Sequence, residues 1–447
     1  MTSTAEPSRV SISELIDGSQ IGSFQIRMFA LCALCLIIEG FDVQAMGYVA
    51  PAVIPELGLE RSALGNILSA ANVGLLIGSM VFTAMADKLG RRPVLIGSTI
   101  GFAILTILTA RATSANELLT YRFLAGISMG SLIPNATALI GEYSPKRLRV
   151  TMMMTISVGF TFGAAVAGFV AAALIPLWGW QSVFYVGGVT PLVIAVLMFF
   201  WLPESLQFLV LKQRQTDKLG VWLKAINPST PTGPGIEYVG NEENKEGVPF
   251  KHLWREGRAT GTVTLWVIYF MNLLALYFLA GWLPTLLNDA GYTTSQAALV
   301  SAALQVGGTI GTFGFAWIIA RRGFISTLTV SFLVAAVSIG AIASQSVVML
   351  ASLLTAVVFI AGWCIVGGQP GLNALVATYY PTSMRSTGVG WCLGIGRVGG
   401  ILGPWLGGQV SGRTMIFAVT VAALIEAGAM FSLRRVITPQ GVSRRAA

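Results

Sequence analysis

The sequence predicts an all-α polytopic membrane protein with twelve transmembrane helices in two six-helix bundles. Three observations lead to this fold class. The 447 residues are 54% hydrophobic and only 11% charged, whereas soluble domains carry about 25% charged residues. Twelve apolar runs are long enough to cross a bilayer, and one polar stretch divides them into two sets of six.

The twelve runs define the predicted helices and domains in chain order. They cover approximately 24–49, 65–86, 93–110, 117–140, 151–175, 181–202, 260–284, 295–319, 325–343, 348–374, 386–409 and 414–433. The predicted organisation is an N-terminal segment 1–23, an N-terminal bundle 24–202, a linker 203–258, a C-terminal bundle 259–434 and a tail 435–447.

Basic residues set the predicted orientation. With the N-terminus inside, the external loops contain only Arg61, Arg111 and Arg413, and two more arginines, Arg122 and Arg397, lie within helices. The other 23 of the 28 Lys and Arg residues fall on the cytoplasmic side, as the positive-inside rule requires. Both termini and the linker are therefore predicted to be cytoplasmic. The same rule explains the net charge of +9 without a nucleic-acid partner.

The four cysteines all lie in apolar runs. Cys32-x-x-Cys35 lacks the further ligands that a metal site needs, so we expect packing residues, with no metal and no cofactor. We also find no phosphate-binding G-x-x-x-x-G-K-(S/T) loop, and ATP is not an expected energy source. The N-terminus does not have the pattern of a cleaved signal peptide.

The two halves repeat a loop pattern. Residues 143–151 and 379–387 both read Y-x-P-x-x-(L/M)-R-x-T. The loop Asp87-Lys88-Leu89-Gly90-Arg91-Arg92 is faintly repeated by 320–323. Matched cytoplasmic loops in a 6+6 parallel repeat are typical of transporters of the major facilitator fold.

The first-half loop resembles the D-(R/K)-x-G-R-R pattern of the major facilitator superfamily. The chain departs from the family at Thr83, where a Gly is usual, and at Ala320, where the second copy often has Asp. The resemblance implies a conformational gate at the cytoplasmic helix ends, for which the candidates are Asp87, Lys88, Gly90, Arg91, Arg92, Glu142, Arg149 and Arg385. For Arg91 and Arg92, simple anchoring of topology is the alternative.

A narrower resemblance starts in the first run. Glu39-Gly40-Phe41-Asp42, followed by Ala45 to Pro51, resembles the aromatic acid/proton symporter family, which contains bacterial 4-hydroxybenzoate transporters. The stretches 122–126, 134–137, 202–205, 282–285 and 393–397 agree with it. That family usually has Asp at the first acidic position, where this chain has Glu39. The resemblance implies import of a small aromatic carboxylate with protons, for aromatic catabolism, by a monomer in the bacterial inner membrane.

Buried charges are the candidates for proton coupling, because charged residues inside a bilayer are costly unless they line an internal cavity. At spacing i, i+3, Glu39 and Asp42 share one helix face. Asp42 and Arg122 both lie roughly 8–9 Å below the external interface, counted at 1.5 Å per residue. We expect a switchable pair, with a static salt bridge as the alternative. Glu39 lies near the midplane, where burial disfavours its charged form, and either acid is a candidate proton carrier.

Arg397 is the candidate contact for the substrate carboxylate, because a guanidinium suits two-point recognition of a carboxylate. The alternative is a pair with Glu39 or with another interior acid. An aromatic ring needs apolar walls and stacking faces, and its hydroxyl needs an amide or a phenol. The candidate ring contacts, with helix packing as the alternative for each, are Tyr269, Asn272, Tyr277, Gln305, Gln369 and Asn373.

Two other functions fit the same fold. A proton-driven exporter is disfavoured because residues 159–168 lack the Gly-Pro pair that antiporters of this superfamily tend to carry. A membrane chemoreceptor is disfavoured because no signalling domain follows the bundles. An enzyme is not expected.

Overall fold

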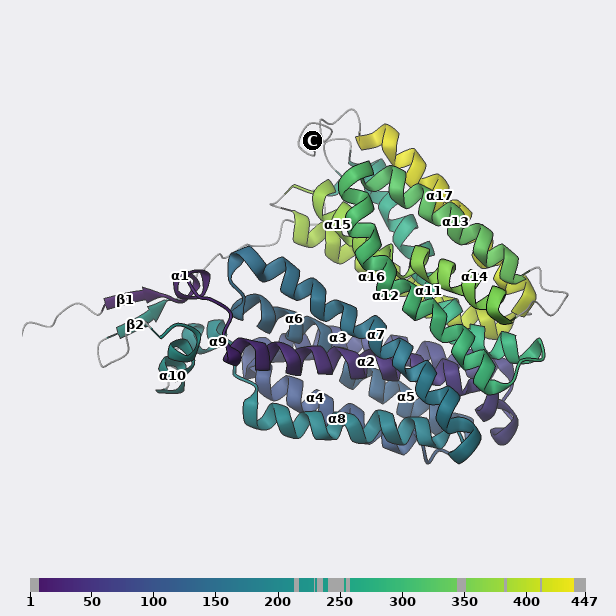
Figure 1. Ribbon diagram of the computed structural model, residues 1–447, viewed down its shortest axis with the longest axis horizontal. Coiled ribbons are helices and arrows are strands. Elements are labelled where there is room, and N and C mark those ends of the chain that lie inside the picture. The colour runs from purple at the N-terminus through teal and green to yellow at the C-terminus, as the bar shows by residue number, and fades with distance from the viewer. Residues whose placement is uncertain are drawn as a thin grey trace, which may run out of the picture.

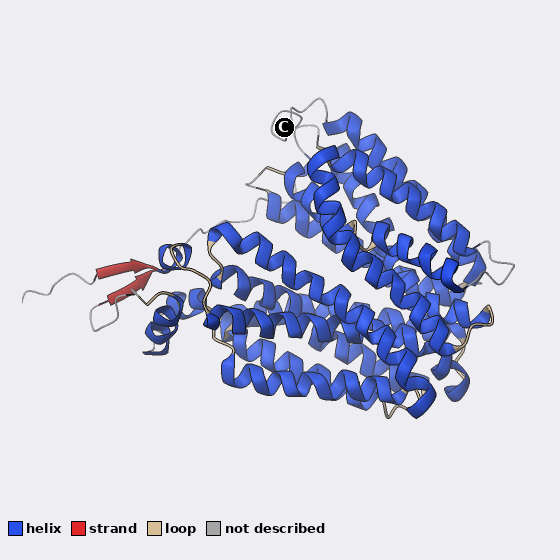
Figure 2. Cartoon of the chain, in the orientation of Figure 1, coloured by secondary structure: helices blue, strands red, loops and turns tan. Residues whose placement is uncertain are grey.

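The computed structural model describes residues 8–212, 217–228, 230, 236–239, 253–254, 258–343, 351–381, 384–410 and 412–437. Nearly all of them are helical (Figure 2). The described helices coincide with all twelve apolar runs of the sequence, and the chain folds into two bundles (Figure 1).

The N-terminal bundle consists of seven helices. The predicted fourth run is divided at Gly130 and Ser131 into α5 and α6, which together cover the length of one span. The helices are α2 (Ser23–Leu57), α3 (Arg61–Leu89), α4 (Arg91–Thr109), α5 (Ala115–Met129), α6 (Leu132–Tyr143), α7 (Lys146–Trp178) and α8 (Gln181–Trp201).

The C-terminal bundle repeats this arrangement, with its fourth span again made of two pieces, α14 and α15. Its helices are α11 (Ala259–Asp289), α12 (Thr294–Arg322), α13 (Phe324–Ala343), α14 (Ala351–Ile365), α15 (Gln369–Tyr379), α16 (Arg385–Gln409) and α17 (Gly412–Ile437). Among the described residues, ten helical segments are long and apolar enough to cross a membrane. The other two predicted spans are α2 and α16, which hold the buried acids and the glycine-rich segment around Arg397.

A small subdomain at the predicted cytoplasmic face departs from the all-helical expectation. Strand β1 (Ser8–Ser11) pairs in parallel with β2 (Ile236–Val239). Three short helices accompany the strands: α1 (Ile12–Asp17), α9 (Leu206–Leu211) and α10 (Asp217–Ile226). Ile12, Ile16 and Leu223 are buried in one apolar cluster with side chains of α2 and α6. Parts of the predicted N-terminal segment and of the linker thus fold together.

The two bundles meet toward the predicted external face and diverge toward the predicted cytoplasmic face (Figure 1). Most polar contacts between them lie in the external half, and one, between Thr309 Oγ1 and Thr161 Oγ1 (2.9 Å), lies near the middle of α12 and α7. Arg61 at the start of α3 forms an ion pair with Asp289 at the end of α11. Ser69 Oγ donates to the Ile401 carbonyl (2.8 Å), and Ser295 Oγ donates to the Ala172 carbonyl (2.6 Å). The described arrangement is therefore closed at the predicted external face.

Candidate functional site

Asp42 and Arg122 form an ion pair inside the N-terminal bundle. Arg122 Nη2 lies 2.8 Å from Asp42 Oδ2, and Arg122 Nη1 donates to Oδ1 at 3.1 Å. The side chains are 0% and 1% exposed, respectively. Helices α2 and α5 place these residues at equal depth, so the contact that the sequence predicted is present. Whether the pair is switchable or a static salt bridge stays a prediction.

Two neighbours hold this pair in place. Thr106 of α4 donates a hydrogen bond to Asp42 Oδ1 (2.9 Å), and the Arg122 guanidinium lies 5.7 Å from the centre of the Phe184 ring. Arg122 Nη2 also donates to the Asp42 carbonyl (3.1 Å). The charges of Asp42 and Arg122 are thereby compensated by each other and by neighbouring hydrogen-bond groups. A buried ion pair needs such partners to offset the cost of removing both charges from water.

Glu39 differs sharply from Asp42. Its side chain is 1% exposed, and neither carboxylate oxygen has a hydrogen-bond partner within the described part of the chain. Arg397 of α16 is half-buried and near enough to interact electrostatically with Glu39, and Tyr277 is near both. No hydrogen bond or ion pair of Arg397 occurs among the described residues, so the direct pair with Glu39 that sequence left open is not formed in this arrangement.

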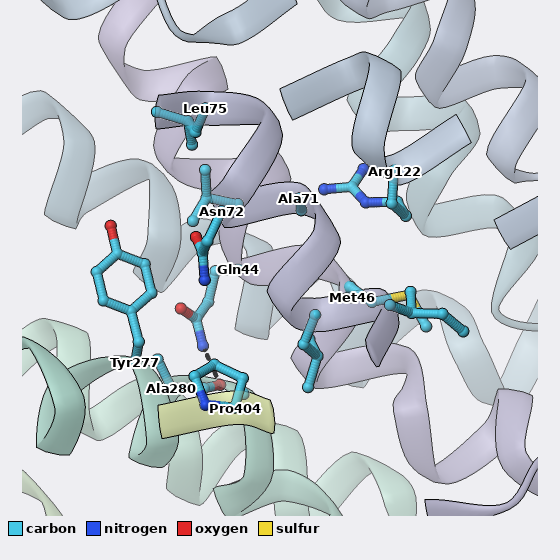
Figure 3. Close-up of a pocket in the computed structure, with 13 residues that line it drawn as sticks. Gln44, Met46, Ala71, Asn72, Leu75, Arg122, Tyr277, Ala280 and Pro404 are labelled. Atoms are coloured by element: carbon cyan, nitrogen blue, oxygen red, sulfur yellow. Dashed lines mark hydrogen bonds between the residues drawn. The ribbon is translucent and has the colours of Figure 1, made fainter. Parts of the chain in front are cut away.

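A small cavity lies where α2, α3, α5, α11 and α16 converge (Figure 3). Its volume is about 30 Å³, room for about two water molecules, while a ligand pocket holds roughly 300–1,000 Å³. The closed external half therefore leaves no space for an aromatic ring at this level. The polar side chains that line the cavity are Gln44, Asn72, Arg122 and Tyr277.

Gln44 and Asn72 are polar residues of this region that the sequence analysis did not single out. Gln44 Nε2 donates to the Ala280 carbonyl, and Asn72 Nδ2 donates to the Gly400 carbonyl (3.1 Å). Each bond joins the N-terminal bundle to the C-terminal one. Gln305, a predicted ring contact on α12, donates to Gln44 Oε1 at 3.4 Å. The available signal was the presence of an amide side chain in an otherwise apolar run.

The remaining predicted ring contacts are divided between two places. Tyr269 donates to Asn373 Oδ1 (2.6 Å), and Asn373 itself is exposed. Gln369 is half-buried, and its Oε1 has no hydrogen-bond partner among the described residues. Asn272 instead lies at the interface of α11 with α17, where its Nδ2 donates to Glu426 Oε1 (2.8 Å). We therefore remove Asn272 from the candidate site, and Glu426 gains the partner that sequence could not name.

The gate candidates near α4 form a polar cluster within the N-terminal bundle. Arg91 pairs with Glu142, whose Oε2 accepts from Ser205 Oγ (2.7 Å). The backbone amides of Arg91 and Arg92 donate to Glu204 Oε1 at 2.8 and 3.0 Å. Glu204, absent from the predicted set, thus caps the N-terminus of α4, where a negative charge is favourable. Gly90 adopts φ +104°, and a Cβ there would lie 2.4 Å from Glu204 Oε2, so this turn requires glycine.

The other gate candidates lie around this cluster. Asp87 and Lys88 are exposed and form no ion pair within the described ranges. Arg149 lies 3.9 Å from Asp17, and Arg385 is exposed at the start of α16. Arg91 therefore pairs within the N-terminal bundle and Arg149 reaches α1 of the cytoplasmic subdomain, and the ion pairs described for these two arginines do not join the two bundles.

Two bundles of helices that are long and apolar enough to cross a membrane, with buried charged side chains inside them, are the arrangement of a membrane transport protein rather than an enzyme. Comparison with known proteins agrees. The model of the Major Facilitator Superfamily matches residues 32–404, and a second match covers 265–446. The chain belongs to this superfamily.

Two bacterial relatives and one solved structure illustrate the likeness. The 4-hydroxybenzoate transporter PcaK of Pseudomonas putida is 37% identical over 94% of both chains. The gallate transporter of Pseudomonas putida is 38% identical over 90% of this chain and 89% of its own. A bacterial homologue of the human lysosomal transporter Spinster, in an inward-facing and occupied conformation, has a TM-score of 0.73 at 16% identity, covering 94% of this chain and 99% of its own. That structure supports the fold alone.

Proposed function

We propose that this protein imports a small aromatic carboxylate with protons across the bacterial inner membrane, by alternating access, with both termini in the cytoplasm. The observation that carries the proposal is the pair of unsatisfied charges at the bundle interface. Among the described residues, Glu39 is buried without a hydrogen-bond partner, and Arg397 of the other bundle forms no ion pair but is near enough to interact with Glu39 electrostatically. Ionisable groups held this way inside a membrane mark solute and proton paths.

The proposed substrate class rests on these residues and on the relatives. The relatives are named as transporters of 4-hydroxybenzoate and gallate, which share a carboxylate on an aromatic ring. Arg397 can offer a planar two-point contact to a carboxylate. The ring would lie against Tyr277 and the amides of Gln305 and Gln369, with Tyr269 and Asn373 further toward the cytoplasm.

Coupling follows from competition for Arg397. A charged Glu39 attracts the guanidinium, whereas a proton on Glu39 removes that attraction and leaves Arg397 for the substrate carboxylate. The Asp42–Arg122 pair, one turn of α2 toward the external face, is the alternative proton carrier. Proton and substrate would thus load together, and rocking of the two bundles would expose the site to the other side.

The cytoplasmic gate is part of the same proposal. Asp87 and Lys88 are exposed and form no ion pair within the described residues, and Arg385 lies at the start of α16 in the other bundle. In the proposal, these three residues contribute to the contacts between bundles that form when the cytoplasmic side closes. The part of that gate that belongs to the N-terminal bundle would be held in place by Arg91, Arg92, Glu142 and Arg149.

Uptake by proteoliposomes tests the function. Vesicles with an acidic exterior should accumulate radiolabelled 4-hydroxybenzoate, and a protonophore should abolish the accumulation. Accumulation that persists with the protonophore would exclude symport. Net efflux driven by an inward proton gradient would identify an exporter instead.

Variants of Arg397 and of Tyr277 test recognition of the carboxylate and of the ring separately. Arg397→Lys keeps the charge but loses the planar fork, and Arg397→Ala loses both, so affinity should fall in that order and equally for differently substituted benzoates. Tyr277→Ala should change the ranking among them. Normal binding by Arg397→Ala would refute this assignment.

A further inference from the structure

The cavity between the bundles holds polar groups whose hydrogen-bonding capacity is not filled. Asn72 Nδ2 is occupied by the Gly400 carbonyl, while no bond to Asn72 Oδ1 occurs among the described residues. The Tyr277 hydroxyl likewise has no hydrogen bond there. Gln44 Oε1 receives only the 3.4 Å contact from Gln305. Two amide oxygens and one phenol thus line a space of about 30 Å³.

The cavity lies slightly less than one helical turn beyond Arg397 along α16, on the external side. Asn72 contacts Gly400, three residues beyond Arg397 on α16, and Gln44 contacts Ala280, three residues beyond Tyr277 on α11. Three residues rise roughly 4.5 Å along a helix. A carboxylate and a hydroxyl on opposite sides of a benzene ring are separated by somewhat more than one helical turn. A ring held by its carboxylate at Arg397 can therefore present a hydroxyl to this cavity.

The chemistry of the cavity suits a hydroxyl group better than an apolar one. Amide oxygens accept the hydroxyl proton, and the Tyr277 hydroxyl can donate to the hydroxyl oxygen. The space admits water-sized groups but not a ring. An unsubstituted ring would not offer these polar groups a hydrogen-bond partner, which is unfavourable where the bound ring keeps water out.

We propose that Asn72 and Gln44, together with the Tyr277 hydroxyl, form a subsite that recognises a ring hydroxyl and so makes the transporter selective for hydroxylated over unsubstituted benzoates. This inference rests on the proposed function. It adds Asn72 and Gln44 as specificity-determining residues, and it places the hydroxyl at the external end of the site and the carboxylate nearer the midplane.

The test compares 4-hydroxybenzoate with benzoate. Apparent affinities for both are measured in proteoliposomes for the wild type, Asn72→Ala and Ser69→Ala. The wild type should bind 4-hydroxybenzoate more tightly. Asn72→Ala should weaken 4-hydroxybenzoate about 3- to 10-fold, the usual effect of one hydrogen bond, and leave benzoate unchanged.

Ser69→Ala is the matched control, because Ser69 also donates one hydrogen bond from α3 to an α16 carbonyl but is not among the cavity-lining residues. It should alter both substrates alike. Tyr277→Phe removes only one oxygen and gives a second comparison if Asn72→Ala does not reach the membrane.

The subsite would be refuted if the wild type bound the two acids with equal affinity, or if Asn72→Ala weakened both acids equally. If Asn72→Ala cannot be produced, an unchanged preference of Tyr277→Phe for 4-hydroxybenzoate over benzoate would refute it. Benzoate uptake would continue in each case, leaving the proposed function intact. If the wild type transports neither acid, the proposed function fails and the subsite fails with it.

Discussion

Asp42 and Arg122 illustrate how a single residue can matter both to folding and to transport. The two side chains exchange hydrogen bonds where almost none of their surface is exposed. Removing one charge of such a pair leaves the other uncompensated, which costs about 3–5 kcal/mol. Structural and coupling roles therefore need to be measured separately.

Asp42→Asn should lower the thermal unfolding temperature in detergent and abolish proton-driven accumulation, because Arg122 loses its counter-charge. Thr106→Val is the control, since it removes one hydrogen bond to Asp42 and leaves the ion pair, at a cost of about 1 kcal/mol. Wild-type accumulation by Asp42→Asn would show that this acid does not couple transport to protons.

Glu426 offers a second residue-scale prediction. It accepts from Asn272 Nδ2, while Asn272 Oδ1 has no partner among the described residues. Glu426→Gln can still accept and can also donate to that oxygen, so unfolding temperature and uptake should stay at or above wild type. Glu426→Leu leaves the buried amide unpaired and should cost about 1–3 kcal/mol.

The double change Glu426→Leu with Asn272→Leu removes both polar partners and should recover most of that loss. Thermal unfolding of the four proteins decides the matter. If Glu426→Gln is as unstable as Glu426→Leu, the negative charge itself is needed for stability.

At the scale of elements, glycine sets the distance between α2 and α7. A Cβ at Gly40 would lie 1.9 Å from the Phe160 carbonyl oxygen, and one at Gly163 would lie 1.8 Å from the Ile37 carbonyl oxygen. Small residues permit such close approach of helix backbones in membranes. Because Gly40 lies between Glu39 and Asp42, this packing also positions both acids.

Gly40→Ala should force the two helices apart, with a stability cost of about 1–3 kcal/mol as for other overpacked interiors, and should reduce uptake by displacing Glu39 and Asp42. Gly97→Ala in α4 meets nothing within 4 Å and should behave as wild type. Equal behaviour of the two variants in thermal unfolding and uptake would contradict this account of the α2–α7 contact.

At the scale of the whole molecule, closure of the external half depends on many weak contacts between bundles. The Arg61–Asp289 ion pair is the outermost of those described above, with side chains 43% and 44% exposed. A pair at that exposure contributes about 0–1 kcal/mol. Its removal can therefore shift the balance between externally closed and open states by up to about fivefold.

Arg61→Asp should increase labelling of a cysteine introduced at Ser69 by an impermeant thiol reagent added outside, because the external side opens more often. The native cysteines are buried, so background labelling should be low. Combining Arg61→Asp with Asp289→Arg restores the opposite charges and should return labelling toward wild type. Unchanged labelling in the single variant would show that the pair does not stabilise closure.

The sequence by itself determined the twelve helical spans, and it predicted their division into halves and the matched depth of Asp42 and Arg122. It could do so because a bilayer requires long apolar helices whose backbone groups are satisfied internally, and because a fixed rise per residue converts position into depth. Asp42 and Arg122 were matched in this way.

The tertiary structure alone decided which way each side chain faces and what it meets. Helices that are apolar on all sides carry little information on their rotation, which their neighbours set through packing. Asn272 thus faces Glu426 on α17 rather than the candidate site, Gln44 and Asn72 reach carbonyls of the opposite bundle, and Glu204 caps α4. The pairing of β1 with β2 likewise joins segments more than two hundred residues apart in the sequence, a contact that only the folded chain creates.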